Sequence, residues 1–218
     1  MDYETLYKVA RNRRSIRRYT EAPVSRETIL RILEVGRWAP SASNSQPWEW
    51  ILVTDREKIT KIGKILSDYI TFVRQKNPKY PVHNVDYLQE VPLLIIVAAD
   101  ERVKNAWTPE RANHFLQVSM GAAIQNVLLA ATSLGLGSVW ISGVSEPNTQ
   151  KKIKEVLDIP NHVSLFACIP IGHSKNPPRR RYRRPLEETV HWNGFDRKKL
   201  RSDSGMEPSS LWKLMAKK

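Results

Sequence analysis

Apolar residues recur every three or four positions in five stretches of the chain, which is the pattern of amphipathic helices. The predicted helices cover residues 2–12, 26–36, 55–76, 110–134 and 147–157. Ser25 stands where a helix N-cap is expected, and Gly135 follows the fourth stretch as a C-terminal glycine does. From Met120 to Leu134 this fourth stretch is apolar on nearly every side. We therefore expect that helix to be buried all round.

Four shorter stretches predict β-strands at residues 48–54, 93–99, 137–142 and 164–172. Residues 93–99 are apolar throughout, which indicates a central strand covered on both faces. Residues 13–19 look extended, whereas residues 77–91 and the C-terminal tail look irregular. Because helices and strands interleave, we expect an α+β fold with a central mixed or antiparallel sheet flanked by helices. The pattern does not fix the direction of the strands.

A chain of 218 residues suits one domain better than two. We place this domain in residues 1–195 and treat residues 196–218 as a basic C-terminal extension. A helix that is apolar on all faces exceeds what one thin sheet can cover in a domain of this size. A subunit interface completes the burial most simply, so we expect a homodimer.

The composition indicates a globular protein, with 41% hydrophobic and 26% charged residues. No apolar run approaches the roughly eighteen residues that a membrane span needs. The N-terminal segment has no apolar stretch of secretory type. Cys168 is the single cysteine, so no intrachain disulfide can form. These features favour a protein of the reducing cytoplasm with no membrane partner.

The net charge of +13 is concentrated near the C-terminus. Residues 175–218 hold thirteen basic and five acidic side chains, a net charge of +8, and five arginines fall within residues 179–184. A basic cluster of this kind fits nucleic acid, a phosphate-bearing cofactor or a solvated surface. The three interpretations stay open at this point.

Candidate chemistry begins with the arginine-rich segment RRSIR. In an extended segment Arg13, Ser15 and Arg17 face the same way. Two guanidinium groups with a hydroxyl between them suit a phosphate, which arginine binds bidentately. The alternative is a solvated basic face, and the segment alone does not decide between the two.

Three further segments have a composition suited to a ligand. The loop PSASNSQPW brackets small polar and amide side chains between two prolines, directly before a predicted strand. GLGSVWISG follows a helix and lacks the last glycine of a dinucleotide fingerprint, but Gly143 can expose its backbone N–H. In RRRYRRPL, alternation places Arg181 and Arg183 together. Each segment taken alone also fits an ordinary turn or a basic surface.

The order of the segments is more informative than any one of them. RRSIRRY, APSASNSQPW, an apolar helix leading into GLGSVWISG, and IPIGHS followed by RYRRPLEETVHWNGF together resemble the nitroreductase family of FMN enzymes. The resemblance covers about Leu6 to Phe195. It implies an intertwined homodimer whose FMN sites lie at the subunit interface, with NADH or NADPH as reductant.

In this family the arginine motif holds the FMN phosphate, the serine-rich loop contacts the FMN of the partner subunit, and the turn after GLGS lies along the flavin ring. The cofactor-binding residues that the resemblance implies are Arg13, Arg14, Ser15, Arg17, Ser41, Ala42, Ser43, Asn44, Gln46, Trp140, Ile141, Ser142, Gly143, Arg181 and Arg183.

The resemblance also implies a mechanism, in which flavin N5 passes a hydride from NAD(P)H to a small organic acceptor such as a nitroaromatic or a quinone. Arg17 is expected to stabilise negative charge near flavin N1 and O2, and the Gly143 N–H to donate toward N5. One flavin face serves both substrates in turn, which predicts ping-pong kinetics. Trp107 and Tyr69 are candidate lids.

The subgroup within the family stays open, because Ser142 stands where other relatives carry glutamate. An ene reductase and a reductive dehalogenase are alternatives, and a nucleic-acid-binding protein that uses the basic tail is the alternative from another class. No metal site is expected, because the five histidines are at least eleven residues apart. Cys168 lies in an apolar strand, which favours a buried, inert thiol.

Overall fold

The computed structural model describes residues 2–78, 83–176 and 182–202. The chain forms two compact units, Met1–Pro177 and Pro178–Lys218. The helices of the first unit are α1 (Tyr3–Asn12), α2 (Arg26–Arg37), α3 (Arg56–Lys76), α4 (Pro109–Ser133) and α5 (Pro147–Leu157), and its strands are β1 (Trp48–Val53), β2 (Leu93–Asp100), β3 (Gly137–Ser138) and β4 (Val163–Gly172). The five predicted helices and four predicted strands are thus confirmed, with β3 shorter than expected.

The four strands form one sheet in the order β1-β2-β4-β3. Every neighbouring pair is antiparallel, which settles the strand direction that the sequence pattern left open. β2 lies in the middle and is buried along almost its whole length, as its uninterrupted apolar sequence predicted. The fold class is therefore α+β, with an antiparallel sheet.

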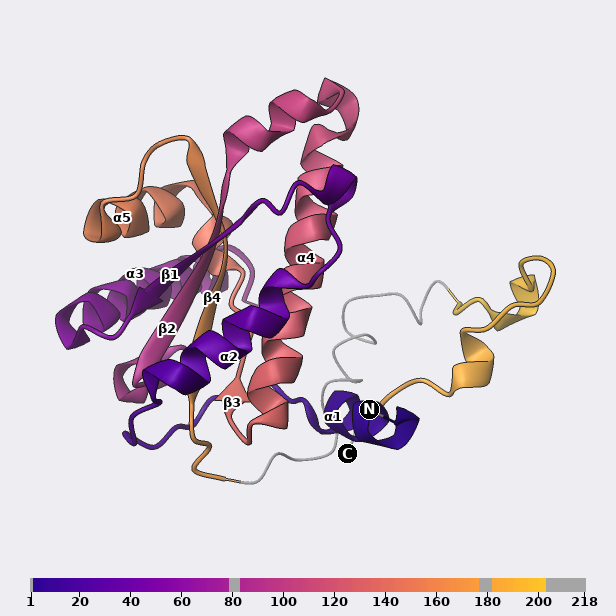
Figure 1. The fold of residues 1–218 in the computed structure, drawn as a ribbon, viewed down its shortest axis with the longest axis horizontal. Helices are drawn as coiled ribbons and strands as arrows, with labels where there is room; N and C mark the ends of the chain where they lie inside the picture. The colour runs from indigo at the N-terminus through magenta and orange to yellow at the C-terminus, as the bar shows by residue number, and fades with distance from the viewer. Residues whose placement is uncertain (1, 79–82, 177–181, 203–218) are drawn as a thin grey trace. The chain divides into compact units, whose positions relative to one another are not determined.

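Helices cover both faces of this sheet (Figure 1). Alternate residues of β2 point to opposite faces. Leu93, Ile95 and Val97 pack with α2 and α4 in one core cluster. Leu94 and Ile96 pack with α3 and α5 in the other. The sheet is thus the middle of three layers.

In a single chain α4 is not buried all round, and its further burial at a subunit interface stays a prediction. Ten of its residues are buried, but Val118 is 50% exposed and Gln125 is exposed on the same side. α4 is also long and apolar enough, by length and composition alone, to cross a membrane. Its most apolar window is half buried in the fold, and core helices of soluble proteins meet the same criterion.

Beyond β3 the sheet is extended by the segment that follows α1. Ser15 forms a parallel bridge with Ser138, and the Ile16 amide donates to the Ser138 carbonyl at 3.0 Å. Within the predicted extended stretch 13–19, Ser15 and Tyr19 form β-bridges, with Ser138 and Ser174. The predicted strand 137–142 is interrupted after Ser138 and touches the sheet again at Ile141, which pairs with Cys168.

The described part of the second unit has one-turn helices at Leu186–Glu188 and Arg197–Lys199. The rings of His191 and Phe195 stack with their centroids 4.3 Å apart. Trp192 is 83% exposed. The domain boundary expected after Phe195 stays a prediction.

Gly137 is the position where the arginine segment approaches the sheet most closely. A Cβ atom built on Gly137 would lie 2.8 Å from Cγ2 of Ile16, closer than real contacts allow. We expect Gly137→Ala to lower the free energy of unfolding by about 1–3 kcal/mol, because overpacking must displace Ile16. Denaturant unfolding monitored by circular dichroism measures the change.

Gly63→Ala in α3 is the matched control for this substitution. Its new Cβ would lie 3.6 Å from Leu88, an ordinary contact, and alanine favours a helix interior by about 1 kcal/mol over glycine. Equal effects of the two substitutions would contradict the close packing at Gly137.

Candidate functional site

The arginine segment and the glycine turn lie at the same edge of the sheet, although more than 120 residues separate them along the chain. Ser15 pairs with Ser138 in β3, and Ile141, three residues further on, pairs with Cys168 of the neighbouring β4. Two of the four segments that the sequence singled out are therefore brought together by one sheet edge.

Two arginines of this segment donate to backbone carbonyl oxygens. The Arg14 guanidinium donates to the carbonyl oxygens of Arg11 and Arg13 at the end of α1, so it turns back toward that helix. Arg17 contacts the Ser15 carbonyl at 3.4 Å. Within the described residues, Arg17 makes no ion pair with a carboxylate.

The buried side chain of Tyr19 holds the backbone of this segment in place. Its side chain is fully buried, and its hydroxyl donates to the Ile16 carbonyl at 2.6 Å. Its ring lies 6.0 Å from that of Tyr87, with the planes tilted by 35°. Burial raises the pKa of Tyr19 well above its usual value, and the nearby Arg17 cation opposes that rise. Tyr19 therefore keeps its proton and its hydrogen bond at neutral pH.

The turn Trp140–Gly143 is packed between two helices. A Cβ atom at Gly143 would lie 2.9 Å from the ring of Tyr69 in α3, so only glycine fits there without displacing Tyr69. On the other side, Trp140 reaches α4, where its ring lies 3.9 Å from the Cβ position of Gly121. Ser142 is exposed. Tyr69, one of the two candidate lids, thus rests directly against the turn.

The serine-rich loop is tied to α4 by a residue that the sequence analysis did not single out. The buried Ser119 hydroxyl accepts from the Ala42 amide at 3.1 Å and donates to the Phe115 carbonyl at 2.7 Å. The Ser41 hydroxyl accepts from the Gln46 amide at 3.0 Å and closes the loop. No local sequence pattern marks Ser119, because its partner is 77 residues away.

This loop has an unusual backbone. Ser43, Asn44 and Gln46 all have positive φ, at 54°, 52° and 46°. The left-handed region costs a non-glycine residue roughly 1–2 kcal/mol, and such residues gather at ligand clamps and active sites. Trp107, the other candidate lid, places its Nε1 atom 3.4 Å from the Ser43 hydroxyl.

Within one chain the loop and the glycine turn lie on different sides of α4. Ser119, which holds the loop, and Gly121, which meets Trp140, are two residues apart and so project about 200° apart around the helix. In Figure 1 the one-turn helix of the loop, Ala42–Asn44, lies beside the upper half of α4, whereas β3 lies at its lower end. One chain therefore does not bring these segments together.

The basic pair after β4 is not placed at this site. Arg181 lies outside the described residues. Arg183 belongs to the second compact unit, where its guanidinium donates to the Tyr182 carbonyl at 2.9 Å. The expected closure of Arg181 and Arg183 on a phosphate stays a prediction.

Two buried hydroxyls in the candidate segments have no hydrogen-bond partner in the described structure, Ser138 Oγ beside Ser15 and Ser45 Oγ in the loop. Buried hydroxyl groups without a hydrogen-bond partner are rare in native proteins. The arginine segment adds cationic donors, and the Gly143 amide, at the start of a one-turn helix, adds a backbone donor. A phosphate-bearing, hydroxyl-rich group such as FMN fits this set of residues.

Cys168 is not part of this chemistry. It is fully buried in β4, and burial alone raises the pKa of its thiol to about 12. A thiol in this environment stays protonated at neutral pH and is a poor nucleophile. The expectation of a buried, unreactive cysteine agrees with this geometry.

The chain belongs to the nitroreductase family, whose sequence profile matches residues 10–173. A protein of Archaeoglobus fulgidus named as an NADH dehydrogenase/NAD(P)H nitroreductase is 32% identical over 79% of this chain and 87% of its own length. The FMN reductase [NAD(P)H] of Bacillus subtilis is 30% identical over 82% of this chain and 69% of its own.

A solved structure agrees with these relatives. The FMN-dependent nitroreductase of Clostridium difficile superposes with a TM-score of 0.67 at 29% identity, covering 86% of this chain and 98% of that one. The family that the ordered motifs predicted is thereby confirmed. These similarities identify an oxidoreductase of the nitroreductase type.

Ser119 offers a direct test of how the loop is held. We expect Ser119→Ala to lower the free energy of unfolding by about 1–3 kcal/mol, because the Ala42 amide loses its acceptor in a partly buried place. Thermal unfolding measures the change. Ser133→Ala, which removes an exposed hydroxyl from the same helix, should stay within about 0.5 kcal/mol of the wild type. A Ser119→Ala protein as stable as this control would show that the tether is unimportant.

Proposed function

We propose that this protein is an FMN-dependent oxidoreductase that takes a hydride from NADH or NADPH and reduces a small organic acceptor such as a nitroaromatic or a quinone. The observation that carries the proposal is the pairing of Ser15 with Ser138, which sets the arginine segment beside the turn that ends at Gly143. FMN reductases among its relatives support the choice of cofactor.

FMN, when bound, supplies the redox chemistry, and the protein supplies position and electrostatics. Arg13 and Ser15 bind the phosphate, because arginine matches its oxygens bidentately and a hydroxyl adds a donor. The Arg17 guanidinium would hold positive charge beside the isoalloxazine, and the Gly143 amide would donate toward N5 and fix the ring. Reductant and acceptor would use the same site in turn, which would give ping-pong kinetics.

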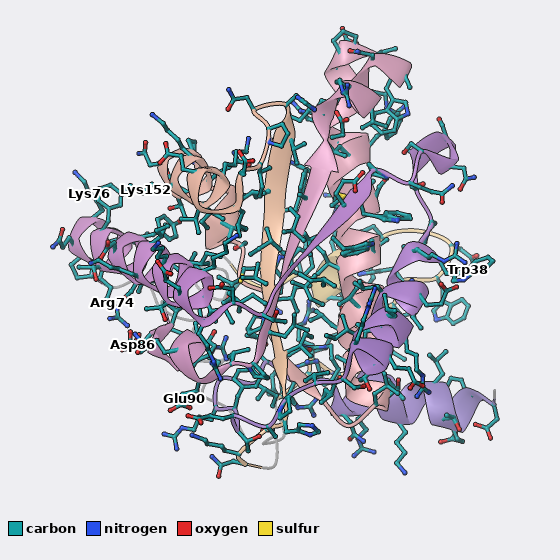
Figure 2. The ribbon with its side chains drawn as sticks, turned by 60° about the vertical axis from the view of Figure 1, so that its left-hand side comes forward. Trp38, Arg74, Lys76, Asp86, Glu90 and Lys152 are labelled. Carbon is teal, nitrogen blue, oxygen red and sulfur yellow. The ribbon has the colours of Figure 1, made fainter. Side chains whose placement is uncertain are left out.

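The active form in this proposal is a homodimer of the cytoplasm. The loop of Ser41, Ala42, Ser43, Asn44 and Gln46 lies on a different side of α4 from the glycine turn, so it contacts FMN bound to the second copy. α4 also leaves Val118 half exposed in one chain. Trp38, 74% exposed, projects from the end of α2 (Figure 2). A second copy that covers these side chains completes their burial.

The cofactor can be tested directly. Protein purified without added flavin should be yellow, heating should release FMN rather than FAD, and anaerobic mixing with NADH or NADPH should bleach the colour. A colourless protein that takes up no added FMN would overturn the proposal. A yellow protein whose colour is not bleached would be a flavin-binding protein without reductase activity.

Arg13 is expected to carry much of the phosphate affinity. Arg13→Ala should weaken FMN binding by about 1.5–3 kcal/mol, the scale of one charge-assisted hydrogen bond. Titration of the apoprotein with FMN, followed by quenching of flavin fluorescence, measures the affinity. Arg26→Ala, at an exposed position in the first turn of α2, is the matched control and should bind FMN as the wild type does. Equal affinities for all three proteins would remove Arg13 from the site.

A further inference from the structure

A cluster of aromatic and cationic side chains lies at the start of α4, and the site described so far includes only Trp107 from it. Trp107 places its Nε1 atom 3.4 Å from the Ser43 hydroxyl and meets the ring of Phe115 edge-on, with the ring centroids 5.7 Å apart. The Cζ atom of Arg111 lies 4.7 Å from the centroid of the Phe115 ring. The ring of His114 lies 6.2 Å from that of Phe115, tilted by 48°. Phe115 is therefore the centre of the cluster, and the Arg111 guanidinium is its fixed charge.

A second set of contacts joins this cluster to the serine-rich loop. The Phe115 carbonyl accepts from the Ser119 hydroxyl, which itself accepts from the Ala42 amide. Arg111, Phe115 and Ser119 follow one another at four-residue spacing, so they lie along one face of α4. The loop therefore packs on the same face of the helix that presents Arg111.

The positive charge of Arg111 is not taken up by a carboxylate of the protein. The side chain is exposed, and in the part of the chain that the structure describes it forms no ion pair. The two carboxylates just before the helix, in residues 100–104, are already paired with Arg102 and Lys104. The loop, residues 41–46, contains no acidic residue.

The contacts that Arg111 does make leave its charge available. Glu110 is the preceding residue of the helix, so it projects about 100° away around the helix axis. The Phe115 ring attracts the guanidinium through its π-electrons and carries no formal negative charge. Arginine binds a carboxylate bidentately through its N–H groups. Arg111 is thus held beside the loop by a partner that does not cancel its charge.

We propose that Arg111 selects the acceptor, and that the preferred acceptors are planar aromatic molecules that carry an anionic group such as a carboxylate. This inference rests on the proposed function, because that function sets the FMN of the second copy against the loop of residues 41–46. An acceptor bound there meets aromatic rings at Trp107 and Phe115, which suit its flat body, and a cation at Arg111, which suits its anionic group.

The test compares two nitroaromatic acceptors of similar size, para-nitrobenzoate and para-nitrobenzamide, of which only the first is anionic at neutral pH. In the reaction NAD(P)H gives up a hydride, solvent gives a proton, and the nitro compound becomes a nitroso compound with release of one water molecule. The holoprotein is first reduced with one equivalent of NADH or NADPH and then mixed anaerobically with either acceptor in a stopped-flow instrument. The return of the yellow colour gives one second-order rate constant for each acceptor.

The measured quantity is the ratio of the two rate constants, benzoate over benzamide, because the intrinsic reactivities of the acceptors cancel when variants are compared. Arg111→Gln should lower this ratio about three- to tenfold, between the effects of an exposed ion pair and of a charge-assisted hydrogen bond. Arg111→Glu should lower it further, whereas Arg111→Lys keeps the charge and should retain most of it. Arg26→Gln, at an exposed position in the first turn of α2, is the matched control and should leave the ratio unchanged.

Three outcomes would overturn the inference. The first is an unchanged ratio in Arg111→Gln, including an equal loss of rate with both acceptors, which would indicate a merely structural role. The second is an unchanged ratio with slower reduction by NADH or NADPH, which would assign Arg111 to the phosphates of the reductant. The third is a reduced wild-type protein that neither acceptor reoxidises.

Failure of the proposed function looks different in the same experiment. A wild-type protein that takes up no FMN, or whose colour neither NADH nor NADPH bleaches, would overturn that function before any acceptor is added. A wild-type protein that is bleached and then reoxidised, with the same ratio in every Arg111 variant, would overturn only the role of Arg111.

Discussion

The hydrogen bond from the Ile16 amide to the Ser138 carbonyl ties the arginine segment to the edge of the sheet, and the rest of the candidate site depends on it. β3 is only two residues long, so it offers the segment few backbone partners. Gly137 permits close approach because it has no side chain, and the Tyr19 hydroxyl holds the Ile16 carbonyl from the other side. A few specific contacts thus replace the long series of backbone hydrogen bonds that positions an ordinary strand.

α4 gives the molecule its second constraint. It packs against the sheet on one side, holds the serine-rich loop through Ser119, and meets the glycine turn at Gly121. Because these contacts point in different directions around one rigid helix, no small movement of the loop can bring it to the turn. The proposed homodimer gives the left-handed backbone of Ser43 and Asn44 a role, because such backbone gathers at ligand clamps and active sites.

The elements of the fold could be predicted from sequence because their signals are local. The helical spacing in residues 55–76 and the uninterrupted apolar run in residues 93–99 lie within single segments, and both gave the right element. β3 was predicted too long because apolar residues continue past Ser138. In the structure the backbone stops pairing with β4 after Ser138 and pairs with it again only at Ile141. The apolar composition of α4 indicated that its faces avoid water, but not which of them one chain covers by itself.

The candidate site was less accessible to such reasoning. The arginine segment and the glycine turn were found because their residue types are unusual and their order resembles a family. Ser119 was missed, because a serine in a helix is unremarkable until its partner, 77 residues away, is known. Residues that support a site from behind are defined by tertiary contacts, so a single sequence contains little trace of them.

Electrostatics links these supporting contacts to the proposed chemistry. Some arginines elsewhere on the surface are paired with carboxylates, as Arg37 is with Glu34 and Arg102 with Asp100. At the sheet edge, Arg17 contacts the Ser15 carbonyl and makes no ion pair with a carboxylate within the described residues. A neutral acceptor leaves the positive charge of Arg17 for a ligand. The role proposed for Arg17 in stabilising added electrons requires that distinction, because an ion pair formed within the protein would already have used the charge.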